Sequence, residues 1–286
     1  MNKTPYQKPY LTRIEALNDQ LWYFLFANEE LNSGLSRFSP KVMEYFTTDL
    51  FYSNKFSSRI HVKAKDLKTH QAKNQQLTFG AYFSNAYEIS INYIRDIFEL
   101  LKENNSLAIY QWNISDAAES NLLNLFTKNG LTFSPQYILD TLSYLRHRRN
   151  HFTHIHTHPN TRLLAYIAAH GAGLATKWKS SGVVSHVDFL SQNNLNNFEV
   201  EETIEFFKLL RICIEELDAY IASVMDESAF IHRLVVEQYG DKKARKNSII
   251  VAQRLTAIIN LAKKYGISAT EAQCAIPVNT IGFKGV

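Results

Sequence analysis

SPQYILDTLSYLRHRRNHFTHIHTHP, residues 134–159, combines the residue spacing of a long helix with an unusual concentration of cationic side chains. Ser134 is a favourable N-cap residue and Pro135 suits the first helical position, whereas Pro159 disfavours helix at the residue before it. Apolar residues recur at intervals of four, three and seven positions, at Ile138, Leu142, Leu145 and Phe152. This spacing places them in one stripe along a helix, so the stretch predicts an amphipathic helix.

Arg149 falls on this apolar stripe of the expected helix. A guanidinium keeps its charge and is costly to bury unpaired, so Arg149 requires an anionic partner, either a carboxylate or a ligand. Asn150 follows directly, and His154 comes four residues after Asn150, on the same side of the helix. The three side chains together form a candidate functional site.

The order of Arg149, Asn150, three further residues and His154 resembles the motif of the HEPN superfamily. In that family an arginine, usually followed by a small polar residue, precedes a histidine after four to six intervening residues. The resemblance covers roughly residues 80–226. It implies a helical bundle with the motif near the end of a long helix. It also implies a homodimer whose two motifs form a composite site that cuts RNA without a metal ion or other cofactor.

Cleavage of RNA by its own 2'-hydroxyl requires a base, an acid and positive charge on the phosphorane, and it leaves 2',3'-cyclic phosphate and 5'-hydroxyl ends. We assign His154 to proton transfer, Arg149 to phosphate binding, and Asn150 to orienting the histidine or the phosphate. Arg146 and Arg148 are expected to hold the flanking RNA backbone. The sequence thus predicts an endoribonuclease.

A second histidine also satisfies the spacing of the motif. Five residues at 100° each place His154 about 140° around an ideal helix from Arg149. His156 is almost in line with Arg149 and has six residues between. We prefer His154 because it stacks over Asn150, and we keep His156 as the alternative catalytic histidine.

Two other interpretations remain open. Histidines 147, 151, 154 and 158 share one helical face and could chelate zinc or copper, but the neighbouring arginines repel a cation and no cysteine lies nearby. We therefore expect no metal site. The other interpretation is a catalytically silent HEPN-like module that binds RNA or a protein without cutting.

Acidic residues elsewhere could pair with the arginines of this helix. In the HEPN family the first bundle helix often carries an acidic or polar residue that faces the motif arginine, and Glu88 is the nearest candidate. A solvated surface carboxylate is the simpler interpretation of Glu88. The acidic side of the helix expected at 198–225 is likewise interpreted as a solvated face rather than as a partner for the arginines.

The rest of the chain predicts an all-α fold with three parts. These are an N-terminal helical extension, an HEPN-like helical bundle and a C-terminal helical appendage, at residues 1–79, 80–226 and 227–286. Helices are expected at 10–32, 80–104, 116–129, 161–170 and 198–225, with two helical segments on either side of Gly240. Short strands are expected at 59–64 and 183–189, and residues 276–286 are expected to be extended.

Composition bounds the class of protein. The chain has 286 residues, 45% of them hydrophobic, which suffices for a core, and its net charge of +4 tolerates nucleic acid without demanding it. Only two cysteines are present, and no apolar leader or spanning segment is evident, so we expect a cytoplasmic protein without a membrane partner. HEPN proteins of the kind that the motif resembles commonly act as toxins or in defence against phage, which would imply an antitoxin or other regulatory partner.

Overall fold

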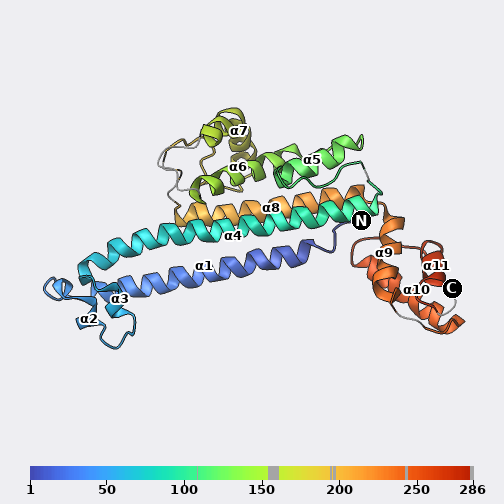
Figure 1. Cartoon of the computed structure of the whole chain (residues 1–286). Coiled ribbons are helices and arrows are strands. Elements are labelled where there is room, and N and C mark those ends of the chain that lie inside the picture. The colour runs from blue at the N-terminus through green and yellow to red at the C-terminus, as the bar shows by residue number, and fades with distance from the viewer. Residues whose placement is uncertain (108, 154–160, 194, 196–197, 242–243, 284–286) are drawn as a thin grey trace. The chain divides into compact units, whose positions relative to one another are not determined.

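The regular structure of the chain is helical (Figure 1). The computed structural model describes residues 1–107, 109–153, 161–193, 195, 198–241 and 244–283. In these ranges it contains eleven α-helices, two short 3-10 helices and no β-strand, which confirms the all-α prediction. Within the same ranges, no helix is both long enough and apolar enough to cross a membrane.

The elements follow one another along the chain without a repeat of length or spacing. In order they are α1 (Gln7–Ser36), η1 (Val42–Glu44), α2 (Thr47–Leu50), α3 (Ser57–Ile60), η2 (Ala64–Asp66), α4 (Leu67–Asn104), α5 (Ala118–Lys128), α6 (Gln136–Thr153), α7 (Thr161–Ser180), α8 (Val200–Val224), α9 (Glu227–Tyr239), α10 (Ser248–Lys263) and α11 (Glu271–Thr280). The expected helices are present, but α1, α4 and α7 are longer than predicted. Helix α4 begins at Leu67, so the expected domain boundary at residue 80 falls inside a continuous helix.

The described chain forms two compact units. Unit 1 comprises residues 1–12, 89–143 and 210–286, and unit 2 comprises residues 13–88 and 144–209. Helices α1, α4, α6 and α8 each supply residues to both units. The units therefore differ from the three consecutive parts expected from sequence, and that division stays a prediction.

Unit 2 is built around an aromatic cluster contributed by α4, α6, α8 and the segment just before α8. Phe83 is fully buried, and its ring centroid lies 4.6 Å from that of Phe206 and 5.6 Å from that of Phe198. Phe152 meets Phe198 edge to face at 5.2 Å. A Cβ added at Gly80 would lie 2.2 Å from the Phe152 ring, so this glycine allows the last turn of α6 to approach α4 closely.

Unit 1 has an apolar core that includes a buried carboxylate of α8. Asp218 of α8 accepts hydrogen bonds from the backbone N–H of Thr4 at 2.7 Å and from the Tyr93 hydroxyl at 3.0 Å. These bonds fix the N-terminal segment, because they satisfy a carboxylate that would be costly to leave unpaired. Helices α9, α10 and α11 pack against one another in the same unit. Helix α11 occupies part of the segment 276–286 that was expected to be extended, so that expectation is wrong for residues 276–280.

The two expected strands are absent from these residues. At 59–64, α3 ends at Ile60, and His61 has a left-handed φ of 35° that breaks an extended run. One isolated bridge, Phe46 to Lys63, replaces a ladder. The alternation of apolar residues here was too short to specify a strand without a neighbouring strand to pair with.

At 183–189, a carboxylate takes the place of a partner strand. The backbone N–H groups of Ser185, His186 and Val187 donate to Glu205 of α8 at 2.7 to 2.8 Å. Burial would raise the pKa of Glu205, but these hydrogen bonds outweigh it and hold the pKa below its ordinary value. The segment is therefore an irregular clamp on α8, which the local sequence pattern could not reveal.

We expect Glu205→Gln to lower the free energy of unfolding by about 1–3 kcal/mol at pH 7, because it removes a charged acceptor of three N–H groups. A carboxyl whose folded pKa is depressed stabilises the fold above its unfolded pKa of about 4.3, and loses this contribution as pH falls through the folded pKa. Urea unfolding at pH 7 and at pH 3.5 should thus show a smaller difference from wild type at the lower pH. Glu201→Gln, on an exposed position of the same helix, is the control. An equal loss at both pH values would show that the charge of Glu205 is irrelevant.

Candidate functional site

Helix α6 carries the candidate motif in its last turns. It begins at Gln136, just after Ser134 and Pro135 as predicted, and its described part ends at Thr153. Ile138 and Leu145 are fully buried, which confirms the first part of the apolar stripe. His154 and His156 lie outside the described residues, so the assignment of the catalytic histidine stays a prediction.

The stripe continues through Arg148, not through Arg149 as expected. Arg148 retains 2% of its accessible surface, whereas the Arg149 side chain is 28% exposed. The buried positions 138, 141, 145, 148 and 151 follow the 3.6-residue period of the helix. Arg149 is 100° further round and so lies at the edge of this face.

Arg149 is nevertheless paired. Its Nη2 donates to Oε1 of Glu88 on α4 at 2.5 Å, and its Nη1 donates to Oδ1 of Asn150 at 3.2 Å. Glu88 is a surface glutamate, as the sequence favoured, with a side chain that is 48% exposed, and it also pairs with the motif arginine.

Part of the Arg149 guanidinium remains available for another anion. Each terminal nitrogen of a guanidinium carries two N–H groups, and one from each is used in the bonds to Glu88 and Asn150. Nε is buried and has no hydrogen-bond partner among the described residues, so the second N–H of each terminal nitrogen is the part left for an anion. Asn150 is held beside the guanidinium, because the two residues are neighbours in the last turn of α6. The pair offers charge and an amide at one place on the protein surface.

Arg148 is committed to the interior of unit 2. Its Nη2 pairs with Oε1 of Glu202 at 2.9 Å and its Nη1 donates to the Tyr144 hydroxyl at 3.0 Å. The guanidinium also lies over the rings of Phe198 and Phe206, at 5.5 and 5.2 Å. Its role is therefore to hold α6 against α8, which corrects the expectation that it binds the RNA backbone. It also corrects the interpretation of the acidic side of α8 as merely solvated.

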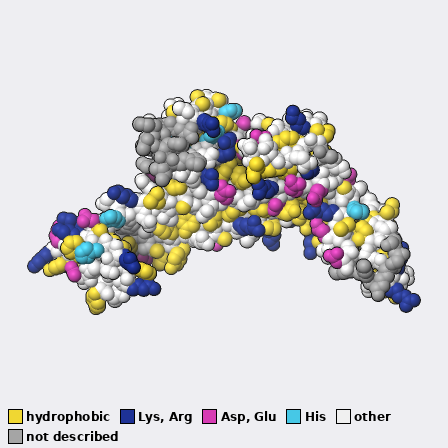
Figure 2. Space-filling view, in the orientation of Figure 1, with side chains coloured by type: hydrophobic (Ala, Val, Ile, Leu, Met, Phe, Trp, Pro, Cys, Tyr) yellow, Lys and Arg dark blue, Asp and Glu magenta, His cyan; other side chains and the backbone are white. Residues whose placement is uncertain are grey.

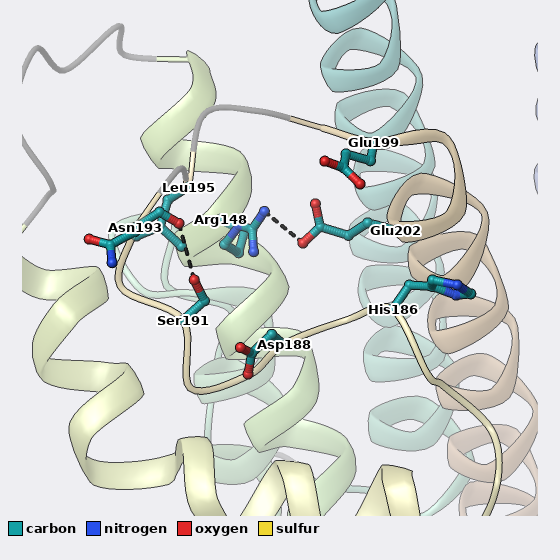
Figure 3. A pocket seen from close by; sticks show the side chains of 8 residues that line it. All are labelled: Arg148, His186, Asp188, Ser191, Asn193, Leu195, Glu199 and Glu202. Carbon is teal, nitrogen blue, oxygen red and sulfur yellow. Dashed lines mark hydrogen bonds and ion pairs between the residues drawn. The ribbon is translucent and has the colours of Figure 1, made fainter.

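A cavity of about 220 Å³ opens beside Arg148 (Figure 3). Arg148 of α6 and Glu202 of α8 point toward each other, and the segment before α8 supplies most of the other walls. The lining residues are Arg148, His186, Asp188, Ser191, Asn193, Leu195, Glu199 and Glu202. Three of these are carboxylates and the one arginine is already paired, so the cavity has the wrong charge for an RNA phosphate.

Arg146, His147 and His151 are the other arginine and histidine residues in the described part of α6. His147 packs against Tyr166 of α7 with ring centroids 5.0 Å apart, and Arg146 Nη2 lies 3.4 Å from the Nε2 of His147. His151 is buried. Among the residues that the structure describes, no three His, Cys, Asp or Glu side chains come together as ligands for an ion. Two members of the histidine face considered for metal, His154 and His158, lie outside those residues.

The two neighbouring arginines should differ in their effect on stability. Arg148→Ala leaves Glu202, whose side chain is only 13% exposed, without its cation, so we expect it to lower the free energy of unfolding by about 3 kcal/mol. Arg149→Ala breaks a pair with a well exposed carboxylate and should cost about 1 kcal/mol or less. Urea denaturation of the two variants measures the difference. Equal costs would contradict the structural role of Arg148, and Arg148→Met combined with Glu202→Leu should recover most of the loss.

Comparison with protein-family models, curated proteins and solved structures finds no match to this chain.

Proposed function

We propose that this chain is an HEPN-like, metal-independent endoribonuclease that acts as a homodimer. The observation that supports the proposal most is the position of Arg149 at the end of α6, oriented by Glu88 and next to Asn150. A guanidinium fixed by a carboxylate and an amide, with further N–H groups to donate, suits a phosphate that gains charge during reaction. An unrestrained surface arginine would lose more entropy in binding the same phosphate.

The proposed reaction uses the 2'-hydroxyl of the RNA as the nucleophile. His154, with His156 as the alternative, removes the 2'-hydroxyl proton while the 2'-oxygen bonds to phosphorus. The bond from phosphorus to the 5'-oxygen breaks, and the protonated histidine of the second subunit gives its proton to that oxygen. The products are a 2',3'-cyclic phosphate and a 5'-hydroxyl. Arg149 binds the phosphorane oxygens and Asn150 orients the phosphate or the histidine.

Two subunits are part of the proposal because the chemistry requires both a base and an acid. With one catalytic histidine in each motif, two motifs supply both groups. A composite site between copies would also place two arginines on one phosphate. The biological setting that we propose, with the HEPN resemblance as its basis, is a toxin or an anti-phage effector, restrained by an antitoxin or other regulatory partner.

The second candidate function is a catalytically silent module that binds RNA or a protein. The same ion pair favours it, because Glu88 neutralises the charge that a phosphate would need. The two candidates differ in what the carboxylate does. In the enzyme, Glu88 positions Arg149 for the phosphate. In the silent module, Glu88 neutralises the charge of Arg149.

Cleavage of a mixed RNA substrate in EDTA tests the enzyme directly. We expect the wild type to release 2',3'-cyclic phosphate and 5'-hydroxyl ends. Arg149→Ala should slow cleavage by about 10²–10³-fold, because it removes charge stabilisation of the transition state. Loss of the catalytic histidine, in His154→Ala or His156→Ala, should slow it by about 10²–10⁴-fold.

Lys128→Ala, an exposed change at the end of α5, is the control for this assay and should be fully active. Undiminished cleavage by Arg149→Ala would exclude the proposed site. Activity only with a divalent ion would instead support the metal interpretation of the histidines.

Substitutions at Glu88 separate the two candidate functions. If Glu88 positions Arg149, Glu88→Ala should lower kcat about tenfold, whereas Glu88→Gln retains an accepting oxygen and should recover most of the rate. The stability of both variants should stay within about 1 kcal/mol of wild type, since the pair is well exposed. A rise in RNA affinity or cleavage in both variants would show that the carboxylate restrains the arginine.

A further inference from the structure

One segment rich in positive charge runs from the end of α1 into the first turns of α4. We define the basic tip as residues 37–73, which contain eight Lys and Arg and three Asp and Glu, a net charge of +5. The whole chain carries +4, so everything outside the basic tip sums to −1. Figure 2, in the orientation of Figure 1, shows Lys, Arg and His side chains gathered with hydrophobic ones over α2 and α3. Residues 144–187 and 242–264 are also rich in Lys and Arg, so charge alone does not distinguish the basic tip from the rest of the chain.

Most of the cations in the basic tip are available to a partner. Lys63 and Lys65 both bind Glu44, at 2.9 and 2.7 Å. The other six are exposed and have no ion-pair partner among the described residues; they are Arg37, Lys41, Lys55, Arg59, Lys68 and Lys73. Exposed cations without carboxylate partners leave a positive potential at the surface, which attracts an anion.

Exposed aromatic rings lie among these cations. Tyr52 is 85% exposed, Phe56 58% and Tyr45 47%. Lys55 places its Nζ 4.9 Å from the centroid of the Phe56 ring. Phe46 and His61 are stacked, with centroids 4.6 Å apart and planes 4° from parallel. Exposed aromatic rings beside unpaired cations are typical of surfaces that bind single-stranded nucleic acid, where bases stack on the rings and phosphates bind the cations.

We propose that the basic tip is a docking surface for single-stranded RNA. Bases stack on Tyr52 and Phe56, while Lys55, Arg59 and the neighbouring cations bind the phosphates. A duplex would leave the rings without a role, because its bases are already stacked and it is recognised through phosphates and 2'-hydroxyls. The choice of RNA over DNA rests on the proposed function, whereas the preference for a single strand rests on the basic tip alone.

An anionic membrane also attracts cations and aromatic rings, but the basic tip lacks the element that such a surface needs. Binding in the plane of a membrane uses an amphipathic helix with a broad apolar face. Helices α2 and α3 have four residues each. The exposed rings are spread over short turns, which suits separate bases better than a continuous apolar layer.

The test is binding of a fluorescent 20-nucleotide single strand with 2'-O-methyl riboses to the full chain, measured by anisotropy at several salt concentrations. This probe lacks the nucleophilic hydroxyl, so the result does not depend on whether the chain cuts RNA. Tyr52→Ala and Phe56→Ala should each weaken binding on the order of tenfold, with the salt dependence unchanged. Lys55→Ala and Arg59→Ala should each reduce the slope of log affinity against log salt by about 0.7.

Matched controls lie elsewhere on the chain. Trp22→Ala removes an aromatic ring of α1 that is 51% exposed, and Lys128→Ala removes an exposed cation of α5. Both should bind like wild type. Unchanged affinity in the Tyr52 and Phe56 variants, or equal affinity for a duplex of the same length, would overturn the proposal.

A membrane role would be seen in sedimentation with vesicles of phosphatidylserine and phosphatidylcholine. Vesicle binding that is lost in the variants of the basic tip, with the oligonucleotide unbound by wild type, would also overturn the proposal. Loss of oligonucleotide binding in these variants alone supports it, even if Arg149→Ala shows that the proposed cleavage is wrong. The two proposals can therefore fail separately.

Discussion

The buried ion pair between Arg148 and Glu202 is the interaction on which the candidate site depends. A guanidinium among aromatic rings is tolerated because Glu202 and the Tyr144 hydroxyl each bind one of its terminal nitrogens. That pair fixes the rotation of α6 against α8. Once this rotation is fixed, the next residue, Arg149, must point 100° away, where Glu88 of α4 meets it. Arg148 thus packs α6 against α8, whereas the adjacent Arg149 binds α4 at the surface.

Much of the fold could be predicted because burial imposes a local period. The spacing of Ile138, Leu142 and Leu145 predicted α6 correctly, since each side chain enters the same core. The rotation of the last turns of α6 could not be predicted as well, because Arg149 and Phe152 both lie near the edge of the apolar stripe. The expected strand at 183–189 was wrong because Glu205, far along the chain, satisfies its backbone N–H groups.

The candidate site was predictable only in part. Arg149 and Asn150 were recognisable from a local motif, and their neighbouring positions in one helix bring them together. Glu88 is 61 residues from Arg149, and its contact depends on how α4 packs, which no short pattern encodes. The accumulation of charge in the basic tip could have been found by counting residues. Its significance depends on the exposure of Tyr52 and Phe56, which only the structure supplies.

Helix α4 begins inside the basic tip, at Leu67, and runs without a break to Glu88, which pairs with Arg149. Leu67 and Glu88 are 21 positions apart in this helix. At 1.5 Å per residue they are separated by about 31 Å along its axis. A strand with stacked bases advances about 3.4 Å per nucleotide, so about nine nucleotides cover that length. The two proposals together therefore predict that a strand with stacked bases needs about nine nucleotides to reach from the start of α4 to Arg149.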